Sequence, residues 1–225
     1  MNGSEDFELA AALLSLLGEP VPHGGEKEAG AAAFRGRMPD DRSALLEAAR
    51  LCGEPRMPRE FYLCTKLYGR LGRQYDAKTA EYAAAYLASP GWEALPQGKK
   101  EERGVPVDLS ARNRAGVYAD LGNACAGLGD YEKARSAYGR AYALEPYRVD
   151  YAIRLADALT LSGKTGEALK FLAEQKKSPY CRTLKYRGVA GGMRYDSSFR
   201  DALDARTAEL EKRMKDAAQS ESRSK

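Results

Sequence analysis

Histidine and tryptophan are nearly absent from this 225-residue chain, which holds one of each, and its four cysteines lie far apart. The only imidazole that could activate a serine or cysteine nucleophile is His23, which lies in the Gly- and Pro-rich stretch GEPVPHGG. No CxxC pair and no second histidine provide a zinc ligand set. P-loop and GxSxG motifs are also missing. We therefore expect no catalytic residue, no metal site and no cofactor, and a protein that is not an enzyme.

Long apolar runs are missing as well. No stretch approaches the roughly 20 apolar residues that a membrane-spanning helix needs. The first residues, MNGSEDFELAAALLSLLGEP, are acidic where a secretion signal would be basic. The few dispersed cysteines suit a reducing compartment. We expect a cytoplasmic protein without a membrane span.

The net charge of +4 is unevenly distributed. Residues 1–58 carry six Lys and Arg against ten Asp and Glu, so the rest of the chain is strongly basic. A basic body can bind a polyanion such as nucleic acid, but helices with mixed charge on their solvent face give the same balance. The charge alone does not choose between these two interpretations.

A repeat of 34 residues organises the C-terminal half of the chain. The segments that start at Ala115, Val149 and Thr183 align without an insertion, although the third copy is weaker. The first segment places a Gly-Asp-Tyr turn between two helically spaced apolar patterns. Small residues recur at the twentieth position, at Ala134, Ala168 and Ala202. Because small residues let helix axes approach closely, we expect a helix crossing at this position.

The period and its pattern resemble the tetratricopeptide repeat, a 34-residue helix–turn–helix with the signature W-x2-L-G-x2-Y…A-x3-F…P. The first segment matches it at Tyr118, Leu121, Gly122, Ala134, Tyr138, Ala141 and Pro146. Tyrosines replace the Trp and the Phe, and Cys125 replaces the Tyr. The resemblance implies an all-α fold, a right-handed α-solenoid of helix–turn–helix repeats. It also implies that the first helix of each pair lines a concave groove that binds partner proteins.

The chain divides into five parts on this interpretation. We expect an N-terminal helix and linker in residues 1–25, degenerate helical hairpins in 26–91, and an inserted loop rich in Pro, Gly and Lys in 92–114. Residues 115–216 are expected to form three repeats, the last with a C-terminal capping helix. Ser198 and Asp201 are expected to form the capping pair at the start of this helix. Residues 217–225 are expected to be disordered. The expected core includes Tyr118, Leu121, Ala134, Tyr138, Leu155, Leu159, Ala168, Leu172, Val189 and Ala202.

The resemblance also implies which side chains face the groove. These candidate partner-binding residues are Ala119, Asp120, Asn123, Arg154, Asp157, Thr160, Arg187, Arg194 and Tyr195. Some members of the family hold the C-terminal carboxylate of a partner with Lys and Asn side chains. Asn123 matches the first Asn position, but Ala119 stands at the Lys position and Arg154 at the second Asn position, so this clamp is incomplete. The arginines can still pair with carboxylates.

We expect a non-enzymatic adaptor, scaffold or chaperone that binds a protein or peptide. Two alternatives remain open. The first is a nucleic-acid-binding protein in which Lys185, Tyr186, Arg187, Arg194 and Tyr195 combine charge with stacking surfaces. The second is a regulatory module that forms a homo-oligomer through its N-terminal helix, with the apolar side chains Leu9, Leu13, Leu16 and Leu17 at the contact.

The register of the repeat is tested by the substitution Ala168→Arg. We expect this variant to unfold or aggregate, because it forces a charge into a close helix crossing. Thermal melting followed by circular dichroism measures the effect. A variant that melted like the wild type would show that the 34-residue register is wrong.

Overall fold

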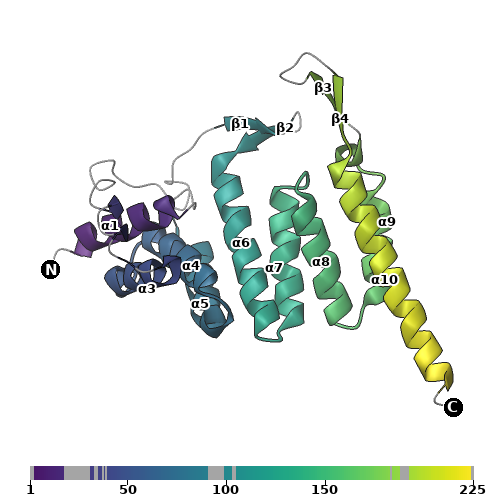
Figure 1. The fold of residues 1–225 in the computed structure, drawn as a ribbon, viewed down its shortest axis with the longest axis horizontal. Helices are drawn as coiled ribbons and strands as arrows, with labels where there is room; N and C mark the ends of the chain where they lie inside the picture. The colour runs from purple at the N-terminus through teal and green to yellow at the C-terminus, as the bar shows by residue number, and fades with distance from the viewer. Residues whose placement is uncertain are drawn as a thin grey trace.

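The protein is an array of helices that lie side by side (Figure 1). The computed structural model describes residues 3–17, 31–32, 35–36, 38, 40–90, 99–102, 105–182, 184–187 and 193–223. Successive helices pair as antiparallel hairpins, and neighbouring hairpins pack against each other. This is the helical solenoid that the sequence predicts, with two small β-hairpins added at one edge.

The described residues of the N-terminal part of the array include four α-helices. Helix α1 (Gly3–Leu16) packs against α3 (Asp41–Cys52), which contacts α4 (Pro58–Leu71). A short 3-10 turn, η2 (Arg73–Tyr75), leads into α5 (Asp76–Ala88), and α4 and α5 form a hairpin. The expected linker at residues 18–25 lies outside the described residues.

Local sequence signals explain where α3 and α4 begin. The Asp40 carboxylate accepts a hydrogen bond of 2.7 Å from the Ser43 backbone N–H, which satisfies one of the free donors in the first turn of α3. Gly53 follows the last residue of α3 with a φ of 57°, where a glycine avoids the strain of a side chain. Pro58 begins α4, and the Glu60 side chain accepts a 3.0 Å bond from the Met57 N–H.

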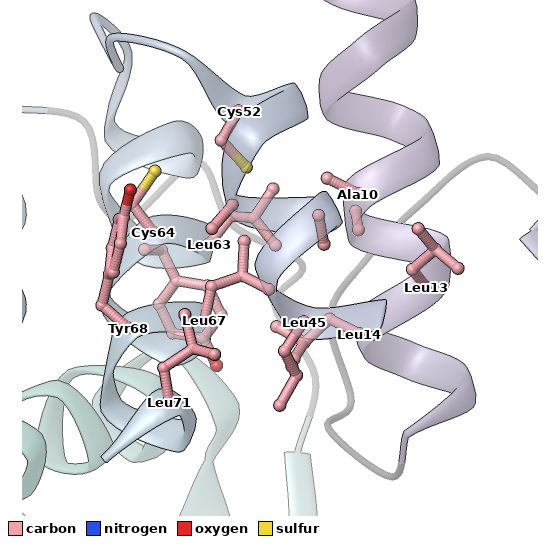
Figure 2. Packing of buried hydrophobic residues seen from close by; sticks show 14 of the residues in the cluster. Ala10, Leu13, Leu14, Leu45, Cys52, Leu63, Cys64, Leu67, Tyr68 and Leu71 are labelled. Atoms are coloured by element: carbon pink, nitrogen blue, oxygen red, sulfur yellow. The ribbon is translucent and has the colours of Figure 1, made fainter. Parts of the chain in front are cut away.

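One hydrophobic cluster joins α1, α3 and α4 (Figure 2). Its labelled members are Ala10, Leu13, Leu14, Leu45, Cys52, Leu63, Cys64, Leu67, Tyr68 and Leu71. Each side chain is at most 8% exposed. The cluster extends into α5 through Tyr86, whose ring lies 5.6 Å from that of Tyr62. The N-terminal helices are therefore part of the array's core.

The 34-residue period is visible in the next four helices, α6 (Leu109–Gly127), α7 (Tyr131–Leu144), α8 (Val149–Leu161) and α9 (Thr165–Gln175). The turn after α6 and the turn after α8 have the same geometry. Asp130 N–H donates to the Cys125 carbonyl at 2.9 Å, and Lys164 N–H donates to the Leu159 carbonyl at 2.8 Å. Left-handed glycines at equivalent positions, Gly129 and Gly163 with φ of 82° and 81°, make this helix ending possible.

Most of the residues predicted to form the core are buried in these helices. Five of them are at most 7% exposed, namely Ala134, Tyr138, Leu159, Ala168 and Leu172. Leu121 and Leu155 are half-buried and pack against the clusters that contain these residues. Tyr118 is half-buried as well and packs against a separate cluster formed by Ala115, Ala119, Ala141 and Tyr151. Val189 lies outside the described residues.

Two short β-hairpins stand at the same edge of the array (Figure 1). Strand β1 (Lys99–Glu102) pairs antiparallel with β2 (Val105–Asp108), and β3 (Leu184–Arg187) pairs with β4 (Met193–Asp196). Each hairpin leads into a helix, β2 into α6 and β4 into α10 (Ser198–Arg223). The first hairpin and the first six residues of α6 occupy much of the range 92–114, so the expectation of a plain loop there is wrong.

The expectation of a third helical repeat is also wrong. Strands β3 and β4 stand where its first helix was predicted, and only α10 represents the second. The sequence gives a physical reason, because the stretch between the strands contains Gly188, Gly191 and Gly192. Each glycine in a helix interior costs about 1 kcal/mol relative to alanine.

Helix α10 differs from the expectation in three further details. Asp201 pairs with Ser197, whose hydroxyl donates a 2.7 Å hydrogen bond to the Asp201 carboxylate, whereas the sequence predicted Ser198 in this pair. Its buried face is formed by Phe199, Leu203 and Leu210, while Ala202 is only half-buried. The helix continues to residue 223, so most of the tail predicted to be disordered is helical. Ala, Glu, Lys and Arg dominate this stretch, and their high helix propensity does not require an apolar face.

The crossing of α6 and α7 depends on Gly122. A Cβ atom on this residue would lie 2.6 Å from the ring of Tyr138, which is closer than carbon atoms can approach. Tyr138 is itself only 5% exposed, so a shift of its ring would cost packing contacts. The glycine therefore permits the close approach of the two helices.

We expect Gly122→Ala to destabilise the protein by about 1–3 kcal/mol, because the overpacking outweighs the better helix propensity of alanine. The matched control is Gly139→Ala in α7, where an added Cβ meets no atom within 4 Å. That variant should gain up to about 1 kcal/mol. Urea unfolding measures both, and equal shifts in the two variants would contradict the close crossing.

Candidate functional site

A cleft of about 320 Å³ lies along the first helices of three successive hairpins, α4, α6 and α8. It is lined by Tyr62, Lys66, Arg112, Asn113, Gly116, Ala119, Asp120, Asn123, Arg148, Asp150, Tyr151 and Arg154. Helical spacing brings these residues to one face, since those of α6 recur every three or four positions. The lining is mostly polar and aromatic.

Two pairs of oppositely charged side chains line this cleft. Lys66 of α4 forms an ion pair with Asp120 of α6, with 2.7 Å between Nζ and Oδ2. Arg148 binds Asp150 through two hydrogen bonds of 3.0 and 2.8 Å. Each of these basic side chains also stacks on a tyrosine, with the Lys66 ammonium 5.6 Å from the Tyr62 ring centre and the Arg148 guanidinium 4.9 Å from that of Tyr151.

Asn123 connects the cleft to the packing behind it. Its side-chain oxygen accepts a hydrogen bond of 2.8 Å from the Tyr138 hydroxyl of α7 and a second bond from Arg154 of α8. Burial raises the pKa of Tyr138, which keeps the hydroxyl protonated and able to donate. One amide thus links three helices in the wall of the cleft.

Burial and charge act in opposite directions on Asp150. Burial raises the pKa of its carboxyl group, but the hydrogen bonds and the charge of Arg148, together with Arg154, lower it further than burial raises it. The pKa of Asp150 is therefore below its usual value, and the pKa of Arg148 is raised, mainly by its hydrogen bonds to Asp150. Both groups are charged at neutral pH.

Two further hollows adjoin the cleft. One of about 750 Å³ shares Asn123 with it and is lined by Gly69, Gly72, Arg73, Asp76, Asn123, Ala126, Gly127, Leu128, Gly129, Tyr131, Tyr138 and Leu161. The other, of about 400 Å³, shares Arg154 with the cleft and is lined by Ala126, Tyr138, Arg154, Asp157, Ala158 and Leu161. Because the three spaces share wall residues, they adjoin one another, and together they make up the groove.

Gly127 has a structural role at the edge of this groove. A Cβ atom on it would lie 1.8 Å from a carboxylate oxygen of Asp76, the first residue of α5. Burial raises the pKa of Asp76. The small residue therefore allows α5 to approach the end of α6, as expected for helix packing.

The structure brings together four of the nine predicted groove residues. Ala119, Asp120, Asn123 and Arg154 all line the cleft. Asp157 lines the adjoining hollow of about 400 Å³, and its carboxylate lies 2.6 Å from Arg206 of α10.

The other predicted groove residues lie elsewhere. Thr160 uses its hydroxyl within its own helix, where it donates 2.9 Å to the Ala156 carbonyl. Arg187, Arg194 and Tyr195 belong to β3 and β4 and not to a groove-lining helix, so their predicted placement is wrong. Lys185 and Tyr186, which the nucleic-acid alternative adds, lie on β3 as well.

Several cleft residues were missed by the sequence reasoning. They come from α4, from the start of α6 and from the turn into α8, and they are Tyr62, Lys66, Arg112, Asn113, Arg148 and Tyr151. One signal was available, because Arg112, Gly116, Ala119 and Asn123 follow a helical spacing that extends upstream of residue 115. The contribution of α4 required knowledge of how the hairpins stack.

Among the described residues, no group of three His, Cys, Asp or Glu side chains is arranged to hold a metal ion. The described helices also include none that is long and apolar enough to cross a membrane.

Stacked helical hairpins with a groove along their first helices define a helical-repeat protein. Residues 126–179, from the end of α6 to the start of the 3-10 turn η4 (Pro179–Cys181), match the family model of the tetratricopeptide repeat. This match confirms the resemblance for that part of the chain, and the repeat is in general a protein-interaction fold. No curated protein matches the chain.

The Asp150–Arg148 pair gives a pH test of the cleft. A carboxyl group whose folded pKa is lowered contributes stability above its unfolded pKa of about 3.9 and loses it as the pH falls through the folded pKa. We expect Asp150→Asn to cost less than about 1 kcal/mol at pH 7, because the side chain is partly exposed. The difference from the wild type should shrink below pH 4.

Urea unfolding between pH 3 and 7 measures this difference. The control is Asp216→Asn on the exposed part of α10, which should follow the wild type throughout. A constant difference between wild type and Asp150→Asn over the whole range would contradict the pairing.

Proposed function

We propose that the protein is a non-enzymatic adaptor, scaffold or chaperone that holds a segment of a partner protein in the groove along α4, α6 and α8. The observation that supports this most is the cleft itself, to which three successive hairpins each contribute the first helix. The match of residues 126–179 to a protein-interaction repeat points the same way.

The physical character of the groove suits a peptide. Its cleft offers hydrogen-bonding side chains that are already fixed by contacts with one another, such as Lys66 with Asp120 and Arg148 with Asp150. A partner that binds them finds side chains already ordered, which lowers the entropic cost of association. The adjoining hollows provide space for apolar side chains of the same segment.

The chemistry of the cleft favours binding over catalysis. Its carboxylates, Asp120 and Asp150, are each paired with a basic side chain. The hydrogen bonds and the charge of Arg148 lower the pKa of Asp150, which makes this carboxyl group a poor general acid at neutral pH. We propose a cytoplasmic location on the grounds given by the sequence.

A photo-crosslinking residue in the groove tests this function. We would place p-benzoylphenylalanine at Leu161, which lines two of the hollows and is 53% exposed, so a bulky apolar residue replaces another. The matched control is the same residue at Leu144, 37% exposed at the end of α7. Irradiation in an extract of the source cells should give a discrete protein adduct at Leu161 and little at Leu144.

Equal labelling at both positions, or none at either, would contradict a partner-binding groove. Circular dichroism melting of both variants is needed first. Unchanged melting shows that the comparison reports on position and not on folding.

A further inference from the structure

We propose that the chain associates head to tail, with the free end of α10 in one copy docked in an apolar pocket between α1 and α4 of a second copy. The residues that line this pocket differ from those that line the groove, so the association does not use the groove. A row of copies offers several grooves at once, which raises the overall affinity for a partner with repeated binding segments.

The pocket lies at the N-terminal end of the array. It has a volume of about 250 Å³ and is lined by Phe7, Glu8, Ala11, Met57, Arg59, Glu60 and Leu63. Ala11 and Leu63 are almost completely buried, whereas Met57 is 60% exposed. A cavity of about 150 Å³ can hold a benzene ring, so this pocket is large enough for the side chain of a methionine.

The charged side chains of the pocket have an acidic excess. Arg59 donates two hydrogen bonds of 2.6 and 3.1 Å to the Glu8 carboxylate, and these two charges balance. Glu60 accepts its hydrogen bonds of 2.7 and 3.0 Å from two backbone N–H groups, which do not neutralise its charge. The surrounding sequence is acidic as well, since residues 1–58 carry ten Asp and Glu against six Lys and Arg. A basic segment is therefore favoured at this end of the array.

Helix α10 offers such a segment at the other end, where it runs past the ends of α8 and α9 (Figure 1). Leu203 and Leu210 are completely buried, but every residue from 211 to 220 is exposed. Met214 follows Leu210 by four positions and Ala217 follows it by seven, so the buried stripe of the helix continues into this free end. Because helices in proteins take most of their stability from packing of such a stripe, a partner surface would stabilise the free end.

The chemistry of the free end complements that of the pocket. Met214 is 46% exposed, and both of its neighbours in sequence, Arg213 and Lys215, are basic and exposed. Arg213 already pairs with Glu209 at 2.7 Å, which leaves Lys215 as the nearer candidate for an acidic partner. The flexible thioether of a methionine adapts to irregular pockets and makes favourable contacts with aromatic rings, of which the pocket provides Phe7.

The two surfaces belong to different copies. Figure 1 shows α1 and the free end of α10 at opposite ends of the array, so one chain does not bring them together. Each contact leaves a pocket and a helix end free, and the assembly therefore extends to further copies unless it closes into a ring. The contact also differs from the one that the sequence suggested for the N-terminal helix, because Leu13 is buried inside the array.

The test uses two single substitutions in the full-length chain, followed by analytical ultracentrifugation over a concentration series. Met57→Asn removes an apolar side chain from the pocket and places a good capping residue at the start of α4. Met214→Gln removes the apolar side chain from the free end of α10 and keeps a high helix propensity. The matched controls are Leu46→Gln in α3 and Leu144→Gln in α7, at positions that are 40% and 37% exposed. Circular dichroism melting first establishes that all four variants fold.

We expect the average mass of the wild type to rise above that of a dimer with concentration, and to fall as the salt concentration is raised. Each of the two variants should associate about tenfold more weakly, because a methionine side chain leaves the contact. The two controls should stay within about twofold of the wild type.

A mixture of the two variants gives the sharpest result. The intact pocket of Met214→Gln can receive the intact helix end of Met57→Asn, but the resulting pair cannot extend. An equimolar mixture should therefore form a one-to-one dimer with the affinity of the wild-type contact.

Three results would overturn the inference. The wild type could stay monomeric at the highest soluble concentration. Met214→Gln alone could abolish association while Met57→Asn had no effect, which would indicate contacts between two helix ends. The mixture could also fail to form the dimer. None of these results bears on the proposed function, because crosslinking at Leu161 tests the groove separately.

Discussion

The contact between Gly122 and the ring of Tyr138 holds α6 and α7 at the distance on which the rest of the groove depends. The same tyrosine reaches past the glycine with its hydroxyl and binds the side-chain oxygen of Asn123. That oxygen also accepts a hydrogen bond from Arg154 of α8, so a packing contact behind the groove determines where a polar group in the groove is placed. The packing of α6 against α7 therefore also determines where the polar side chains of the groove lie.

The two ends of the array are closed in different ways. At the N-terminal end, α1 and α3 pack on α4 through apolar side chains, among them Cys52 of α3 and Cys64 of α4 (Figure 2). A hydrogen bond with Cys64 and burial raise the pKa of the Cys52 thiol far above its usual value, so it packs as a small neutral group. At the C-terminal end, α10 covers α8 and α9, and Arg206 approaches the Asp157 carboxylate at 2.6 Å. Burial nevertheless raises the pKa of Asp157.

The β-hairpins show how the array departs from a simple repeat. Both stand at one edge and lead directly into a helix, α6 in one case and α10 in the other (Figure 1). The second hairpin takes the place of a helix that the 34-residue register requires. The repeat therefore ends after α9, and α10 caps it without being part of a third hairpin.

The sequence by itself determined the helical hairpins and their turns, because these depend on short-range spacing. Gly129 and Gly163, with the small residues Ala134 and Ala168, fixed the period and the crossing points. The sequence also located Asn123 and Arg154, which lie in consecutive repeats with a clear register.

Only the tertiary structure decided which hairpins contribute to one cleft. Tyr62 and Lys66 lie more than 40 residues before Ala115, and nothing local to them indicates that they face Asp120. The prediction of a third repeat was wrong for a related reason. The apolar residues of that segment fit a helical spacing, but neighbouring glycines and strand pairing compete with a helix, and a pattern of side chains does not include that competition.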